Sequence, residues 1–145
     1  MLLLLATAAG AQVKYEDATG GVVEMTFEQQ EGGLFLCVKT DSESSRMVDP
    51  PTIAFSLVGD EVMALTGSID RYDSGTDRFS LSGLTITSQR QYSYARFAIA
   101  PEQVERIGQG VVRIQIAMQP YANDCKWRKD KIGRKLLAWY HKVVE

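Results

Sequence analysis

The chain has 145 residues, of which 45% are hydrophobic and 23% charged, with a formal net charge of −2. This length allows one domain with a sizeable core, whereas two domains would be crowded. The charge is uneven: residues 1–110 hold 8 Lys/Arg and 15 Asp/Glu, a balance of −7, whereas residues 111–145 hold 8 and 3, a balance of +5. After residue 11 no apolar stretch approaches the roughly 20 residues of a transmembrane helix, so we expect no transmembrane segment and a soluble mature chain.

The first segment, Met1–Ala11, is typical of an export signal. Four leucines lead to the small residues Ala9-Gly10-Ala11, which fit signal-peptidase pockets, and the apolar block is too short to span a bilayer. No Lys or Arg precedes the leucines, and the alternative is a first strand at Leu2–Leu5. The signal predicts a periplasmic or secreted protein, with residues 12–145 as its single domain.

Apolar and polar residues alternate with a period of two over most of the next hundred residues, which is typical of half-buried strands. The segment 40–51, rich in Asp, Ser and Pro, predicts a surface loop, and Gly59-Asp60 predicts a hairpin turn. The expected strands lie at residues 23–27, 34–39, 53–57, 62–66, 79–81, 84–86, 92–99 and 112–118.

The middle of the chain carries two further signals. Asp73-Ser74-Gly75-Thr76-Asp77 consists of turn-forming residues and predicts a hairpin tip. The apolar positions then change parity, from odd at Phe79 and Leu81 to even at Leu84 and beyond. We interpret Ser82-Gly83, where the parity changes, as a bulge or bend.

Two segments have helical spacing. A short helix is expected near 101–108, because it starts with Pro101 and Glu102 and ends at glycine. An amphipathic helix is expected near 126–144, capped by Asn123 or Asp124 and weakened inside by Gly133. Seven or eight strands with these helices predict a mainly β (α+β by content) antiparallel sandwich or partly open barrel, with the last helix covering an edge or end of the core.

Few residues point to catalysis. Triad chemistry would have to use His141, the sole histidine, near the end of a helix, and no phosphate-binding or dinucleotide motif occurs. The acids Asp70, Asp73 and Asp77 lack the calcium-loop spacing, and two cysteines with one histidine cannot complete a zinc site. We therefore expect no metal and no cofactor, and we favour a protein without enzymatic activity.

Cys37 and Cys125 are the two cysteines of the chain. In an oxidising compartment they could form a disulfide that closes a long loop, worth on the order of 4 kcal/mol. The alternative is a pair of unpaired thiols, with Cys37 acting as a small hydrophobe within a strand. The distance between the two residues decides, and the sequence does not contain it.

Two groups of side chains are candidate binding surfaces. The first is aromatic, and it could stack on sugars or anchor a protein, the alternative being core or cross-strand packing: Tyr92, Tyr94, Tyr121 and Trp127. The second is basic, and it could contact anionic lipid, the alternative being a helix docked on the sandwich: Lys126, Lys129, Arg134 and Lys135. Nucleic acid is not an expected partner of an exported protein.

The pattern Pro101-x-x-x-Val104-x-x-Ile107-x-x-Gly110-Val111-x-Arg113-Ile114, followed by a lysine-rich terminal helix, resembles the C-terminal third of small exported β-rich proteins of Gram-negative bacteria that lack an assigned function. The resemblance implies export and the order strand, short helix, strand, terminal helix. Our leading hypothesis is a non-enzymatic periplasmic or secreted binding module. The alternatives are a glycan-binding or carbohydrate-active protein that uses Tyr, Trp and carboxylates, and an envelope-associated protein that contacts anionic lipid.

Overall fold

The computed structural model describes residues 12–144, which form eleven strands and two helices. The predicted export signal, Met1–Ala11, lies outside the described residues. The expected mainly β fold is confirmed, with antiparallel pairing between all neighbouring strands. Seven strands have five or more residues, and the other four are short strands that are not among the expected ones.

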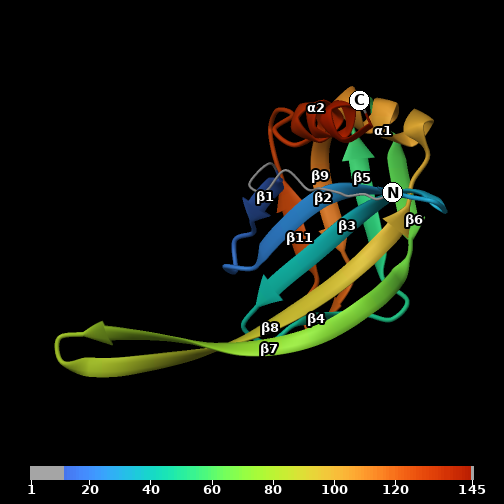
Figure 1. Ribbon diagram of the computed structural model, residues 1–145. Coiled ribbons are helices and arrows are strands. Elements are labelled where there is room, and N and C mark those ends of the chain that lie inside the picture. Colours follow the sequence, from blue (N-terminus) through green and yellow to red (C-terminus); the bar gives the residue numbers. More distant parts are fainter. Residues whose placement is uncertain (1–11, 145) are drawn as a thin grey trace.

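The strands form two main sheets and one small one (Figure 1). The five-stranded sheet has the order β1 (Val13–Glu16), β2 (Val22–Gln30), β3 (Gly33–Ser42), β8 (Leu84–Ala98) and β7 (Ser68–Leu81). The four-stranded sheet has the order β11 (Asn123–Lys126), β9 (Val111–Ile116), β5 (Thr52–Leu57) and β6 (Val62–Thr66). The short strands β4 (Arg46–Met47) and β10 (Met118–Gln119) pair with each other.

The core lies between the two main sheets, because each contributes one face of alternating apolar side chains. Met25 of β2 and Leu36 of β3 face Phe55 of β5 and Ile114 of β9 across this core, and all four are fully buried. The residues between these buried positions point outward and are polar or only half-buried. The period of two in the sequence therefore marks the inner face correctly.

Both helices lie at one end of the sandwich, where they pack against each other (Figure 1). α1 (Pro101–Gly108) has the predicted bounds. The prediction for the last helix is wrong at its start, because α2 spans Gly133–Val144 and residues 127–132 form a connection rather than helix. Residues 123–126, which include both expected caps, pair with β9 as β11. The cap is Asp130 rather than Asn123 or Asp124, since its carboxylate accepts hydrogen bonds from the backbone N–H groups of Gly133 and Arg134.

The prediction of a hairpin tip at residues 73–77 is also wrong, because these residues lie within the 14-residue strand β7. The chain turns instead at Ser82-Gly83, where the parity change predicts a bulge or bend. Ser82 and Gly83 both have positive φ, 51° and 81°, the conformation of a two-residue type I′ hairpin turn. Such a turn pairs Leu81 with Leu84, so a parity change is what the hairpin itself produces.

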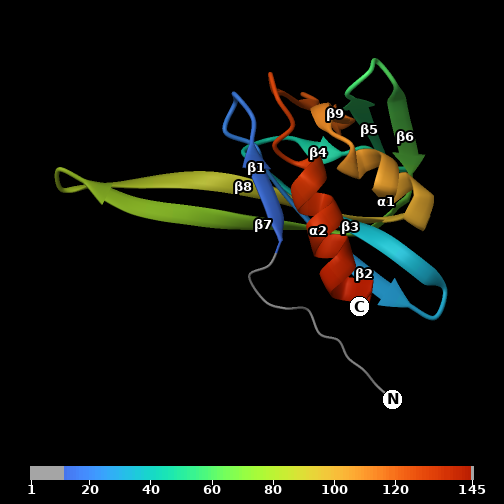
Figure 2. The ribbon, with the colours of Figure 1, turned by 90° about the horizontal axis from the view of Figure 1, so that it is seen from above.

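This hairpin extends far beyond the body of the protein (Figures 1 and 2). β8 pairs with β3 only from Gln91 onward, so its outer part, Leu84–Arg90, pairs with Gly75–Leu81 of β7 alone. We call this two-stranded ribbon, residues 75–90, the arm. Seven residue pairs at about 3.4 Å each make it roughly 20 Å long.

Candidate functional site

The arm has two different faces. Residues directly opposite each other in an antiparallel pair point to the same side of the sheet. Near the turn the register places four apolar side chains on one face: Phe79, Leu81, Leu84 and Ile86. The other face carries Arg78, Ser80, Thr85 and Thr87.

The apolar face of the tip is open to water. Phe79 is 52% exposed, Leu81 60% and Leu84 68%, which places them among the most exposed large hydrophobic residues of the protein. A two-stranded ribbon has no second layer to cover such a face. Grouped apolar side chains of this kind are typical of surfaces that another molecule covers.

The base of the arm is held to the body on its outer face by stacked cations and rings. The Arg71 guanidinium lies 3.8 Å from the centroid of the Tyr94 ring, and the Lys39 ammonium lies 5.1 Å and 5.6 Å from the centroids of Tyr92 and Tyr94. Tyr92 also covers Gly75, where an added Cβ would lie 2.9 Å from the Tyr92 ring. The two tyrosines therefore support the arm where it leaves the sheet.

Polar contacts hold the base from other sides. The Tyr72 hydroxyl donates a 2.8 Å hydrogen bond to the carbonyl of Met47, and burial raises the pKa of this hydroxyl, with the Asp49 charge adding to the effect. The Arg90 guanidinium binds the Asp41 carboxylate at 2.7 Å, and the Arg90 side chain is only 15% exposed. These contacts fix the direction in which the arm points.

The four aromatic residues nominated by the sequence do not form one site. Tyr92 and Tyr94 share a face, as predicted, but they lie at the base of the arm under the cations. Tyr121 is 71% exposed and lines a pocket between the sheets. Trp127 packs edge-on against Tyr15, with 5.3 Å between the two ring centroids. Cross-strand and core packing thus account for three of the four.

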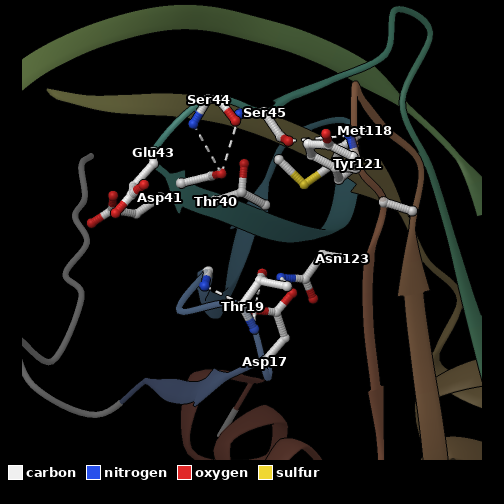
Figure 3. A pocket seen from close by; sticks show the side chains of 13 residues that line it. Asp17, Thr19, Thr40, Asp41, Glu43, Ser44, Ser45, Met118, Tyr121 and Asn123 are labelled. Carbon is white, nitrogen blue, oxygen red and sulfur yellow. Dashed lines mark hydrogen bonds between the residues drawn. The ribbon is translucent and has the colours of Figure 1, made fainter.

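That pocket has a volume of about 310 Å³ and opens where the β1–β2 turn, the end of β3 and the start of β11 meet (Figure 3). Asp17 organises its floor, because one carboxylate oxygen accepts hydrogen bonds from Thr19 and Gly21 and the other accepts one from the Asn123 amide. Thr40 and Asn123 are almost fully buried in its wall. The lining combines carboxylates and hydroxyls with apolar groups such as those of Met118 and Ala122, so the pocket offers both hydrogen-bond donors and acceptors beside an apolar surface.

A second pocket, of about 320 Å³, lies on the outer face of the five-stranded sheet and contains Cys37. Burial, with the nearby Glu28 carboxylate as the next cause, raises the pKa of the Cys37 thiol to about 11. The Cys37 Sγ lies 3.8 Å from Glu28 Oε2. Because the thiolate is the nucleophile, this thiol is weakly reactive near neutral pH.

Cys37 and Cys125 do not form a disulfide in the structure, because both are free thiols. Cys37 points to the outer face of β3, and the Cys125 Sγ lies 3.7 Å from the carbonyl oxygen of Glu16. Cys37 is half-buried on this outer face, rather than packed inside as a small hydrophobe.

The acids and the histidine take ordinary surface roles. Asp70 pairs with Arg96 and Asp73 with Arg71, both along β7 and β8 rather than at a turn. Within residues 12–144 no group of three or more His, Cys, Asp or Glu side chains is arranged to hold a metal ion. His141 lies exposed on α2, with its Nε2 4.0 Å from Glu105 Oε2.

The basic residues nominated by the sequence, Lys126, Lys129, Arg134 and Lys135, are all exposed. The apolar side of α2 is not, because Leu136 and Trp139 are buried in the core. The docked helix therefore leaves only its polar side for a partner. Neither helix in the described part of the chain is long and apolar enough to cross a membrane.

No protein family, curated protein or solved structure was found to match this chain. The candidate site consequently rests on the geometry above. The projecting arm was not predicted from the sequence, although the parity change around Ser82-Gly83 was its signal.

Proposed function

We propose that this protein is a non-enzymatic binding module that engages another protein through the apolar face of its arm. The observation that supports this most is the register, which gathers Phe79, Leu81, Leu84 and Ile86 on one side of a ribbon that projects from the body. The expected export signal adds that the partner is periplasmic or extracellular.

The tip offers enough apolar surface to contribute substantially to binding. Its three most exposed side chains present on the order of 300 Å² of apolar surface. Covering that surface at ~25 cal/mol per Å² yields a ceiling of about 7 kcal/mol before the costs of association. Because contacts at its base already hold the arm in one orientation, binding costs little conformational entropy for ordering the arm.

A protein partner fits better than a lipid bilayer or a second copy. Both edges of the arm carry unpaired backbone N–H and C=O groups, which hydrocarbon cannot satisfy but another polypeptide can. Two tips packed together would bury only about 600 Å², below the ≈1,000 Å² expected of a stable dimer. The partner therefore supplies the larger share of the interface, as a groove or an exposed strand edge does.

The glycan-binding alternative has less support. A sugar stacks on an open ring face, whereas a cation lies over each of the Tyr92 and Tyr94 rings. Tyr121 is exposed and borders the pocket next to Asp17, but it does so alone among the four aromatic candidates.

Site-specific photo-crosslinking in the cells that make this protein tests the proposal. A benzophenone amino acid replaces Leu84 at the tip, and in a matched control it replaces Val58, which is also apolar and 59% exposed but lies on the body. We expect a discrete adduct from position 84 that is absent from position 58 and is lost when Phe79 and Leu81 are changed to serine. Equal adducts at both positions, or none at position 84, would overturn the proposal.

A further inference from the structure

A second surface, separate from the arm, carries a dense set of cations. We define the basic ridge as the exposed residues Lys126, Arg128, Lys129, Lys131, Arg134 and Lys135. They run from the end of β11 through the connection to the first turn of α2. The ridge holds six of the 16 basic residues of a chain whose net charge is −2.

The ridge is held in place by the residues between the cations. The backbone N–H of Trp127 donates a 2.8 Å hydrogen bond to the Val112 carbonyl, and the Trp127 ring packs on Tyr15. Asp130 accepts hydrogen bonds from backbone N–H groups, and Ile132 is buried in the core. Inward anchors thus alternate with outward cations, so the cations are presented by an ordered backbone.

The acids nearby are engaged elsewhere. The Arg113 guanidinium forms a bidentate ion pair with the Asp124 carboxylate, with N–O distances of 2.7 Å and 2.9 Å. Both oxygens of Asp130 face backbone N–H groups, and its one ridge neighbour, Arg134, is 4.0 Å away and 89% exposed. Within residues 12–144 the other five ridge residues have no carboxylate within ion-pair distance. The positive charge of the ridge therefore faces solvent.

We propose that the basic ridge binds the phosphate-bearing headgroups of an anionic membrane surface. Clusters of four to eight basic residues bind such surfaces at about 1 kcal/mol per Lys or Arg. Contact is electrostatic and without insertion, because the apolar side of α2 is already in the core. No ridge residue lines either pocket described above, and the Trp127 ring packs against Tyr15, so this ring is not open to stack on a base as in a single-strand binder.

Vesicle co-sedimentation of residues 12–145, the expected mature chain, tests this proposal. The probes are vesicles of phosphatidylcholine alone and vesicles containing 30% phosphatidylglycerol, at low and at physiological salt. The ridge variant is Lys129→Gln/Lys135→Gln. The control variant, Lys14→Gln/Arg78→Gln, removes the same charge from two exposed positions outside the ridge.

We expect binding to the anionic vesicles only, weakened by salt and weakened about 30-fold in the ridge variant, since two charges are removed. Equal loss in the control variant, or equal binding to neutral vesicles, would overturn the proposal. So would tighter binding of a 20-nucleotide single strand than of the anionic vesicles. Loss of vesicle binding in Phe79→Ser/Leu84→Ser, with the ridge variant unaffected, would assign membrane contact to the arm and contradict both this inference and the proposed function.

Discussion

Replacing Asp130 tests how the end of the chain is fixed to the sandwich. One carboxylate oxygen accepts hydrogen bonds from the N–H groups of Val111, at 2.9 Å, and Gly133, at 2.7 Å. The other accepts one from Arg134 at 3.1 Å. A single side chain thus joins the start of β9, the start of α2 and the basic ridge.

The expected cost follows from these three bonds. Loss of a helix cap alone costs about 1 kcal/mol, and hydrogen bonds to a charged group contribute roughly 1.5–3 kcal/mol each without adding fully. Val111 and Gly133 are buried, so their N–H groups have no ready replacement partner. We expect Asp130→Ala to lower the free energy of unfolding by about 3 kcal/mol, and Asp130→Asn, which keeps one acceptor oxygen, by about 1 kcal/mol.

The effect depends on pH in a defined direction. Desolvation acts to raise the pKa of Asp130, but hydrogen bonds from backbone N–H groups, first among them that of Val111, outweigh it and lower the pKa below its ordinary value of 3.8. A lowered native pKa stabilises the fold above the unfolded pKa, and this stabilisation is lost as pH falls through the native pKa. The free energies of unfolding of the wild type and of Asp130→Asn therefore become more similar below about pH 4.

Urea unfolding followed by circular dichroism, at pH 7 and at pH 3, measures the loss in free energy of unfolding and its dependence on pH. Asp77→Ala is the control, because Asp77 is an exposed acid on the arm and its loss should change stability by less than about 0.5 kcal/mol. If Asp130→Ala behaves like the control at pH 7, the anchoring role is refuted. A difference between wild type and Asp130→Asn that is unchanged at pH 3 would refute the role of the charge.

Three further predictions concern single positions. Gly133→Ala should lower the melting temperature despite the higher helix propensity of alanine, because the added Cβ would lie 2.3 Å from the Ile107 carbonyl oxygen; a raised melting temperature contradicts this packing. Tyr72→Phe should cost about 1 kcal/mol and speed amide exchange at the base of the arm, as measured by hydrogen exchange; unchanged exchange would show that this bond does not hold the arm. Cys37 should react with Ellman's reagent at pH 8 about 100-fold more slowly in the native than in the denatured protein, because its pKa is about 11 rather than 9.0; equal rates would contradict its burial.

The predicted sheets and the short helix were recoverable because their signals are local. Alternation along β2 and β9 marks the buried face directly, and Pro101 with the following acids marks the start of α1. The caps expected for the last helix, Asn123 and Asp124, are wrong because residues 123–126 lack a strand signal of their own. They become a strand only because β9 offers them an open edge.

For the candidate sites, too, the sequence revealed local features but not contacts between distant segments. The sequence identified the ridge cations and the tyrosine pair, since charge and spacing along one strand are local properties. It could not show that cations cover Tyr92 and Tyr94, or that Asp124 and Asp130 point away from the ridge, because these contacts join distant segments.

The sequence by itself determined the mainly β class, the uneven charge and the apolar residues on both sides of Ser82-Gly83. Only the tertiary structure decided that this pair is the turn of a projecting hairpin and that residues 73–77 are part of its strand. Turn-forming residues are tolerated in β7 because the arm lies outside the core and Tyr92 covers Gly75. Propensity describes each residue alone, whereas pairing between β7 and β8 fixes which side chains share a face, and that pairing creates the apolar tip.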